Sequence, residues 1–239
     1  TYISGSTSSS MGDTTICDGA CAQLNASGGT SYVWSPTTGL SNPNIANPTA
    51  CPTVTTTYVV TGTDANSCTS TDTVVVTVSP LPTANAGNDT TICIGDSVQL
   101  NATGGASYTW TPAGSLTNPN IANPIAFPNT TTTYVVTVTD GLGCVDTDTV
   151  IVTVANLPVI TITNDTTICD GACAQLNATG GTSYSWSPTT GLSNPNIANP
   201  IACPIVNTTY VVTVTNAANC TVTDSVTITI NPLPTITAS

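Results

Sequence analysis

The sequence predicts an all-β protein built from three tandem sandwich repeats in an elongated array. Three observations predict this class: one unit recurs three times, Thr, Val and Ile are abundant, and there are ten cysteines. Thr, Val and Ile are stiff at χ1 and suit a pleated surface. Glu, Lys and Arg, which favour helices, are absent, so we expect almost no helix.

The repeat has a period of 76 residues, with no insertion or deletion between copies. The period relates three sets of residues: Cys17, Cys93 and Cys169; Trp34, Trp110 and Trp186; Tyr58, Tyr134 and Tyr210. Internal repetition at such a period indicates an array of similar units. We predict a tail of a preceding unit or a linker at 1–10, repeats at 11–82, 83–158 and 159–234, and the start of a following unit at 235–239. The segment is therefore expected to come from a longer chain.

Each unit shows short alternating strands separated by turn residues. In the middle copy Val98, Leu100 and Ala102 form one inward face, and Val136 and Val138 form another. Gly-Gly, Ser-Pro and Asn-Pro-Asn lie between such segments and are typical of turns. The Asn-Pro-Asn-Ile-Ala-Asn-Pro loop is unchanged in all three copies, and we interpret it as a rigid structural turn.

One Trp and one Tyr in each unit refine this class to an immunoglobulin-like sandwich. Trp34 and its counterparts lie where such a sandwich places its central core Trp. The Thr-Thr-Tyr-Val-Val segment around Tyr58 resembles a tyrosine corner, although Val60 stands where antibody domains have a Cys.

The composition excludes several classes of function. The chain has no Lys, Arg or His and a formal charge of −12, so it cannot neutralise the phosphates of nucleic acid or an anionic membrane surface. Without His, the usual nucleophilic triads cannot form. The carboxylate pair Asp146 and Asp148 is better explained as a solvated strand edge than as a glycosidase pair. We expect no enzyme activity, no cofactor and no direct insertion into a membrane, since no apolar run of 18 residues occurs.

The ten cysteines indicate disulfides and an oxidising, extracellular location. Four cysteines in a unit allow three pairings, but the middle repeat has Ser97 and Phe127 where its neighbours have cysteines. Two cysteines lost together are most simply partners, and Phe127 would fill the volume of the missing bridge. The predicted pairs are Cys17–Cys68, Cys21–Cys51, Cys93–Cys144, Cys169–Cys220 and Cys173–Cys203.

The motif string Ile-Cys-x-Gly, Leu-Asn-Ala, Tyr-x-Trp, Asn-Pro-Asn-Ile-Ala-Asn-Pro, Thr-Tyr-Val-Val-Thr and Leu-Pro resembles a known family. It is similar to the PKD-like or immunoglobulin-like repeats of Bacteroidota cell-surface proteins, including SprB-like gliding-motility adhesins secreted by the type IX route. The resemblance covers about residues 11–234. It implies export, attachment to the cell surface and a role in adhesion or gliding.

The same resemblance implies O-glycosylation, at Ser or Thr after Asp and before an apolar residue or Thr. The matching residues are Thr14, Thr73, Thr90, Thr149, Thr166 and Ser225. Strand alternation predicts that Thr73, Thr149 and Ser225 face solvent. Ser97 also matches the pattern but is expected to be too buried.

Calcium is the one metal ion that we consider. Asp13, Asp89 and Asp165 lie at the unit junctions, and carboxylate oxygens there are weak candidate ligands for Ca²⁺. No loop with EF-hand spacing is present, so we favour turn and cap chemistry for these residues.

Together these points predict a structural stalk or fibre segment of a large secreted adhesin, which spaces a distal adhesive region from the cell. Its partners are neighbouring repeats of the same chain. The main alternative is a subunit of a self-assembling extracellular filament, with lateral or end-to-end association through poorly protected edge strands. A further alternative is a spacer array of a secreted hydrolase.

Overall fold

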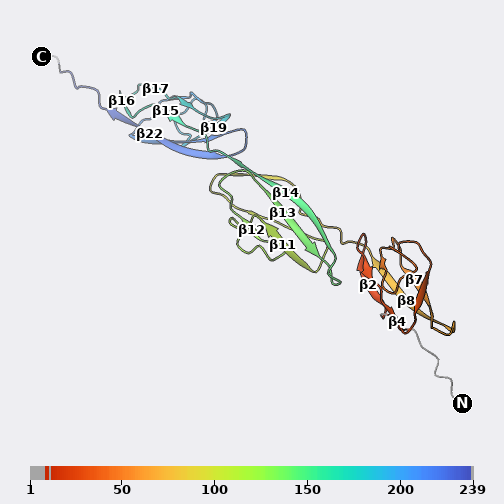
Figure 1. The fold of residues 1–239 in the computed structure, drawn as a ribbon. Coiled ribbons are helices and arrows are strands. Elements are labelled where there is room, and N and C mark those ends of the chain that lie inside the picture. Colours follow the sequence, from red (N-terminus) through yellow and green to blue (C-terminus); the bar gives the residue numbers. More distant parts are fainter. Residues whose placement is uncertain (1–8, 11, 238–239) are drawn as a thin grey trace. The chain divides into compact units, whose positions relative to one another are not determined.

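The computed structural model describes residues 9–10 and 12–237, and within them every regular element is a β-strand (Figure 1). The predicted segment 1–10 lies outside this part except for residues 9–10, as do residues 238–239 of the predicted following unit. The prediction of an all-β chain is confirmed for the described residues.

The described residues of the first and third repeats contain the same order of strands, and the middle repeat has the same order without counterparts of the first and fourth of them, where a single bridge joins Asn85 and Thr103. The first contains β1 (Ser9–Ser10), β2 (Thr14–Cys17), β3 (Ala22–Gln23), β4 (Ala26–Ser27), β5 (Ser31–Ser35), β6 (Thr49–Ala50), β7 (Thr56–Thr63) and β8 (Thr69–Ser79). The second contains β9 (Thr90–Cys93), β10 (Val98–Gln99), β11 (Ser107–Thr111), β12 (Ile125–Ala126), β13 (Thr132–Thr139) and β14 (Val145–Ala155). The third contains β15 (Thr161–Ile162), β16 (Thr166–Cys169), β17 (Ala174–Gln175), β18 (Ala178–Thr179), β19 (Ser183–Ser187), β20 (Ile201–Ala202), β21 (Thr208–Thr215) and β22 (Thr221–Asn231).

Each repeat is a two-layer sandwich. In the first, a four-stranded sheet has the order β2-β8-β7-β5, and β3 pairs with β6 in a separate small sheet. Strand β2 runs parallel to β8, whereas the other pairs of this sheet are antiparallel. The corresponding sheets are β9-β14-β13-β11 with β10-β12, and β16-β22-β21-β19 with β17-β20. The chain is therefore a tandem array of immunoglobulin-like sandwiches, as the sequence predicts.

The core of a repeat forms where the two layers face each other. In the first repeat Leu24 packs with Trp34, Tyr58 and Val74, and all four are almost completely inaccessible to solvent. Along β7 buried and partly exposed residues alternate, because successive side chains of a strand point to opposite faces. The inward residues Leu100 and Ala102 of the middle repeat are likewise buried.

The Asn-Pro-Asn-Ile-Ala-Asn-Pro loop holds the core Trp of its repeat. The indole nitrogen of Trp34 donates to the carbonyl oxygen of Ile45 at 2.9 Å, and Trp110 and Trp186 bond the same loop position in their repeats. A buried indole N–H needs such an acceptor. This contact supports the structural interpretation of the loop.

The Tyr at this position of each repeat does not form the tyrosine corner that the sequence suggests, and in the middle repeat the hydroxyl of Tyr134 bonds that of Ser115. The hydroxyl of Tyr58 donates to the carbonyl oxygen of Thr38 at 2.8 Å, 20 residues upstream, and Tyr210 bonds Thr190 in the same way. A tyrosine corner would instead bond the backbone only a few residues upstream. Burial raises the pKa of both Tyr58 and Tyr210.

By its internal contacts the described chain divides into two compact units. One comprises residues up to 85 together with 103–109 and 137–148, and the other comprises 86–102, 110–136 and the residues from 149 onward. The turn between β13 and β14 thus belongs with the first repeat, and the boundaries expected at 82/83 and 158/159 stay predictions.

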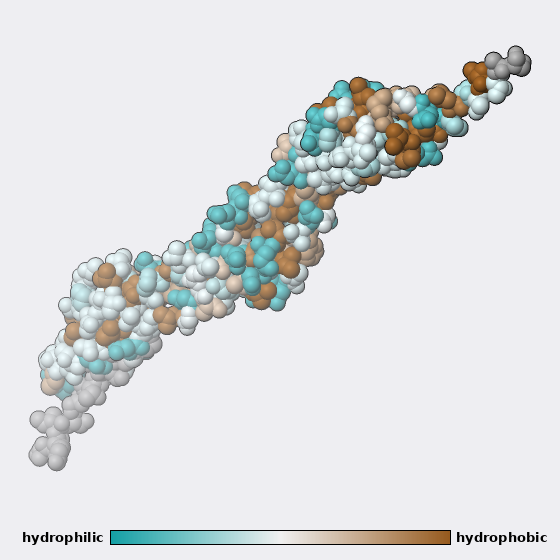
Figure 2. All heavy atoms as spheres, turned by 180° about the vertical axis from the view of Figure 1, so that it is seen from behind, coloured by the Kyte–Doolittle hydropathy of each residue, from teal (hydrophilic) through white to brown (hydrophobic). Residues whose placement is uncertain are grey.

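On the face shown in Figure 2, apolar residues lie in separate spots among many Thr, Ser and Gly residues of intermediate hydropathy. Scattered apolar residues of this kind are ordinary for a protein surface.

Candidate functional site

The two cysteines that flank the last strand of a repeat lie at its opposite ends. Cys68 directly precedes β8, whereas Cys17 is in register with Ser79, the last residue of β8. An 11-residue strand at ~3.3 Å per residue separates these ends by roughly 30 Å. A disulfide requires Cα atoms within about 7 Å, so Cys17 and Cys68 of one repeat cannot be joined.

The predicted pairs Cys17–Cys68, Cys93–Cys144 and Cys169–Cys220 are therefore wrong. The structure joins Cys17 to Cys144 and Cys93 to Cys220, each across 127 residues, with Cα atoms 5.5 and 5.6 Å apart. Each of these cystines connects the end of β2 or β9 to the turn before the last strand of the next repeat. Cys68 and Cys169 remain as free thiols, and both are exposed.

The two local cystines agree with the sequence prediction. Cys21 pairs with Cys51, and Cys173 pairs with Cys203, each closing a separation of 30 residues. In the first repeat Ala22 lies opposite Ala50 in the small sheet, and Cys21 and Cys51 are the next pair of residues along the two strands.

In the middle repeat the positions of the local cystine are at the surface. Val98 lies opposite Ala126, so Ser97 and Phe127 are the next pair along the two strands. Ser97 is exposed, and Phe127 is 45% exposed. The expectations that Ser97 is buried and that Phe127 fills the core are therefore wrong, because the cystine that they replace is itself at the surface.

We call the contacts around Cys17–Cys144 the first joint. The backbone N–H of Ala84, in the segment that follows the first repeat, donates to Oδ2 of Asp146 at 3.0 Å. Asn85 and Thr103 then exchange two backbone hydrogen bonds. Asp146 thus binds a backbone amide of the linker near the cystine. This structural contact accounts for Asp146 without a catalytic carboxylate pair with Asp148.

The second joint surrounds Cys93–Cys220 and uses a different polar contact. The side-chain amide of Asn216 donates to the carbonyl oxygen of Asn156 at 2.8 Å. The chain then enters β15, which pairs with β18, and Ile160 and Ile162 pack against the core of the third repeat.

A glycine lies under the linker at each joint. At Gly104 the backbone has φ +110°, and an added Cβ would lie 1.9 Å from the carbonyl oxygen of Thr83. At Gly180 φ is +104°, and a Cβ would lie 2.0 Å from the carbonyl oxygen of Val159. Both the conformation and the close approach of the linker require glycine.

At each joint the cysteine that directly precedes the last strand of its repeat is buried. Cys144 and Cys220 are each 1% exposed. Beside the second joint a hollow of about 350 Å³ is lined by Cys93, Gly95, Asp96, Leu157 and Asn219, among others. One cysteine of each cystine is therefore shielded from solvent, whereas its partner, Cys17 or Cys93, is half-buried.

The carboxylates considered for calcium accept backbone hydrogen bonds. Asp13, Asp89 and Asp165 accept the amides of Val75, Ile151 and Thr227, each 62 residues later in the sequence. Each tethers the start of its repeat to the last strand.

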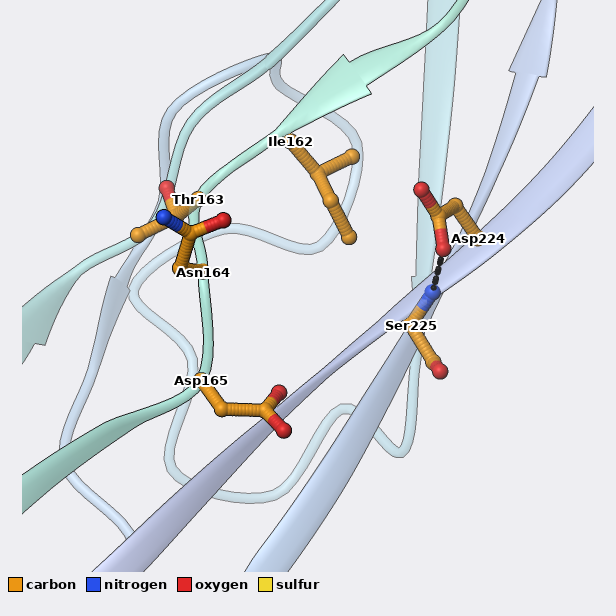
Figure 3. Close-up of a pocket in the computed structure, with 6 residues that line it drawn as sticks. All are labelled: Ile162, Thr163, Asn164, Asp165, Asp224 and Ser225. Atoms are coloured by element: carbon orange, nitrogen blue, oxygen red, sulfur yellow. Dashed lines mark hydrogen bonds between the residues drawn. The ribbon is translucent and has the colours of Figure 1, made fainter.

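Figure 3 shows the hollow around Asp165, where the backbone N–H of Ser225 donates to Oδ1 of Asp224. Within the described residues no three His, Cys, Asp or Glu side chains come together as a metal site. Calcium binding by Asp13, Asp89 and Asp165 stays a prediction.

The predicted glycosylation residues fall into two groups. Thr73, Thr149 and Ser225 are exposed, as their strand positions predict. Thr14, Thr90 and Thr166 are half-buried at the start of β2, β9 and β16. Modification of any of the six stays a prediction.

No protein-family model and no curated protein matches this chain. Among solved structures it is similar to immunoglobulin domains 1–5 of Sidekick-1, at 15% identity over 93% of this chain and 58% of that one, with a TM-score of 0.34. It is also similar to a Ca²⁺-stabilised adhesin that helps an Antarctic bacterium to bind ice, at 15% identity over 96% of this chain and 75% of that one, with a TM-score of 0.38. Among the described residues no helix has the length and apolar character to cross a bilayer.

Proposed function

We propose that this chain is a non-enzymatic, load-bearing segment of the stalk of a large secreted bacterial surface adhesin, which spaces an adhesive region from the cell. The observation that carries the proposal is the overlap of the two joint cystines. One spans residues 17 to 144 and the other spans 93 to 220, so both enclose the stretch from 93 to 144.

This overlap makes the chain tolerant of a single break. A peptide bond cut at any one place between Cys17 and Cys220 leaves the two fragments joined by at least one cystine. Such a property suits a segment exposed to proteases and to tension outside the cell. The absence of Lys and Arg also removes every trypsin site.

The cystines also limit how far tension can extend the chain. A fully reduced chain of 239 residues extends to about 800 Å. With all four cystines intact, the shortest covalent path between the ends uses only about a third of the residues, and the extension stops near ~300 Å.

Single-molecule force extension with handles at the two ends tests this function. The tested chain carries Cys68→Ser and Cys169→Ser, so that free thiols do not join molecules. We expect a limit of about 300 Å in the oxidised chain and about 800 Å after reduction. In a matched variant with serine at Cys17, Cys93, Cys144 and Cys220, the limit rises to about 600 Å. Equal extension with and without reductant would contradict the load-bearing role.

The proposal also includes the cellular location of the stalk segment. Four cystines in 239 residues favour an oxidising, extracellular compartment. The resemblance to Bacteroidota repeats supports attachment at the cell surface, type IX secretion, a role in gliding or adhesion, and O-glycans on Thr73, Thr149 and Ser225 as parts of this proposal. Intact mass of the chain from its native source tests the glycans: we expect added hexose masses that disappear when the three residues are changed to Ala. A mass equal to the bare polypeptide would contradict them.

A second function, subunit of a self-assembling extracellular filament, is favoured by one observation. Cys68 and Cys169 are exposed and unpaired, although their counterparts at the joints are bonded.

A further inference from the structure

Both ends of the first repeat are attached to the start of β14. Cys17, the last residue of β2, is bonded to Cys144. The backbone N–H of Ala84, in the segment that follows β8, donates to Asp146 at 3.0 Å. Cys144 and Asp146 are two residues apart in the sequence. Tension that enters along β2 therefore has a covalent route into β14 that leaves out the rest of the first repeat.

The second joint has the same arrangement at the ends of the middle repeat. Cys93, the last residue of β9, is bonded to Cys220. The carbonyl oxygen of Asn156, directly after β14, accepts a hydrogen bond from the side chain of Asn216 at 2.8 Å. The two joints thus share the proximity of the two ends of a repeat, although different side chains secure it.

Without the cystine, tension on the first repeat would have to cross the hydrogen bonds between β2 and β8. These strands run parallel, and Cys17 lies opposite Ser79 at their ends. The backbone N–H of Val75 donates to Asp13 before this ladder, and that of Asp18 donates to the carbonyl oxygen of Ser79 after it. Because the chain enters at the start of β2 and leaves at the end of β8, tension slides the two strands past each other and loads all of these bonds together.

We propose that the first joint is a tension bypass, in which the cystine Cys17–Cys144 passes tension from β2 directly into β14, so that the first repeat stays folded while the chain is under load. Strand β14 can carry this tension along its own backbone, because a strand of 11 residues is already almost fully extended. The ladder between β2 and β8 carries tension only when this cystine is absent.

This inference rests on the proposed load-bearing function and adds the route that the load takes. The overlap of the joint cystines limits the final length of the chain, whereas the bypass concerns the folding of one repeat at lower tension. A chain that is limited in length by its cystines, but carries tension across the ladder between β2 and β8, would keep the proposed function and overturn the bypass. Equal extension with and without reductant would contradict the proposed function itself.

Force extension of the chain with its two free thiols changed to Ser, and with handles at both ends, tests the bypass. An insertion of about 20 Gly and Ser residues between Ala65 and Asn66, in the turn between β7 and β8, lengthens any step that stretches the first repeat by roughly 70 Å. With Cys17–Cys144 intact, we expect the same steps with and without the insertion. Cys17→Ser with Cys144→Ser should add one step of roughly 110 Å, which the insertion lengthens to about 180 Å.

The second joint provides the matched control. Cys93→Ser with Cys220→Ser also removes one joint cystine but keeps Cys17–Cys144, so the insertion should again change no step. A step that lengthens with the insertion in this chain or in the intact chain would overturn the proposal. The absence of the added step from the chain without Cys17–Cys144 would overturn it as well.

Asp13→Ala tests whether the ladder between β2 and β8 carries tension, because it removes the hydrogen bond from Val75. In the chain without Cys17–Cys144 we expect it to lower the rupture force of the added step, and an unchanged force there would overturn the role of the ladder. In the intact chain we expect every rupture force to stay the same. A lower rupture force in the intact chain would show that the ladder shares the load with the cystine and would overturn the bypass.

Discussion

The middle repeat and its two neighbours differ in their local cystine but not in their joint cysteines. The outer repeats have Cys21–Cys51 and Cys173–Cys203, whereas the middle repeat has Ser97 and Phe127. Its core is nevertheless complete, with Trp110 and Tyr134 fully buried. The local cystine therefore adds to a fold that the core already specifies, whereas the cystines Cys17–Cys144 and Cys93–Cys220 connect one repeat with the next.

The largest expected effect comes from giving the middle repeat the cystine of its neighbours. Ser97→Cys with Phe127→Cys places two cysteines at the pair of positions that follows Val98 and Ala126 in the sheet. Closing a loop of about 30 residues should raise the free energy of unfolding by about 3–4 kcal/mol, which chemical denaturation under oxidising conditions measures.

The reverse exchange is the matched control for this prediction. Cys21→Ser with Cys51→Phe gives the first repeat the residues of the middle one, and we expect a loss of similar size with the joint cystines retained. If either exchange changed the pairing of Cys17 with Cys144, the separation of local and joint cystines would be wrong.

The sequence predicts the sandwiches well because the relevant information is local. Alternation along strands, turn residues and the period of 76 residues identify the core residues and the local cystines within one unit. The joint pairing could not be obtained in this way. The middle repeat contains Cys93 and Cys144 and suggests that they are partners, but the distance between them depends on the length of β14 and the parallel register of β9.

One pattern could have revealed the joint pairing from sequence. Cys17 and Cys68 flank the whole last strand of the first repeat, and an alternating strand of 11 residues is too long for a disulfide to span. The polar contacts of Asp146 and Asn216 could not be predicted from the repeat. The two residues occupy different positions of their repeats, so the period of 76 residues does not relate them.

An intermediate effect is expected at the glycine under the first joint. Gly104→Ala meets the carbonyl oxygen of Thr83 and a positive φ, whereas Gly95→Ala has a positive φ but open space around its Cβ. We expect Gly104→Ala to cost about 2–3 kcal/mol and Gly95→Ala about 1–2 kcal/mol in the free energy of unfolding. Equal costs would mean that the linker does not press on Gly104.

The smallest effect concerns the buried tyrosines of the outer repeats. Tyr58→Phe removes the hydrogen bond to Thr38 and should cost about 1 kcal/mol in thermal or denaturant unfolding.

The same tyrosines give a pH dependence. Because burial raises the pKa of Tyr58 and Tyr210, the unfolded chain ionises first as pH rises. Their contribution to stability is complete below the ordinary tyrosine pKa of about 10 and is lost as pH rises through the raised pKa. In a chain with Phe at both positions, this part of the loss of folding stability above pH ~10 should disappear. An unchanged dependence of the free energy of unfolding on pH in this range would contradict the raised pKa values of the two tyrosines.

Chemical cleavage without reduction tests the joint cystines most directly. Met11 is the single methionine, so Leu81→Met in a chain with Cys68→Ser and Cys169→Ser lets cyanogen bromide cut at 11 and 81 only. If Cys17 is bonded to Cys144, the fragments 12–81 and 82–239 stay together on a denaturing gel until reductant is added. Release of the fragment 12–81 before reduction would contradict the account.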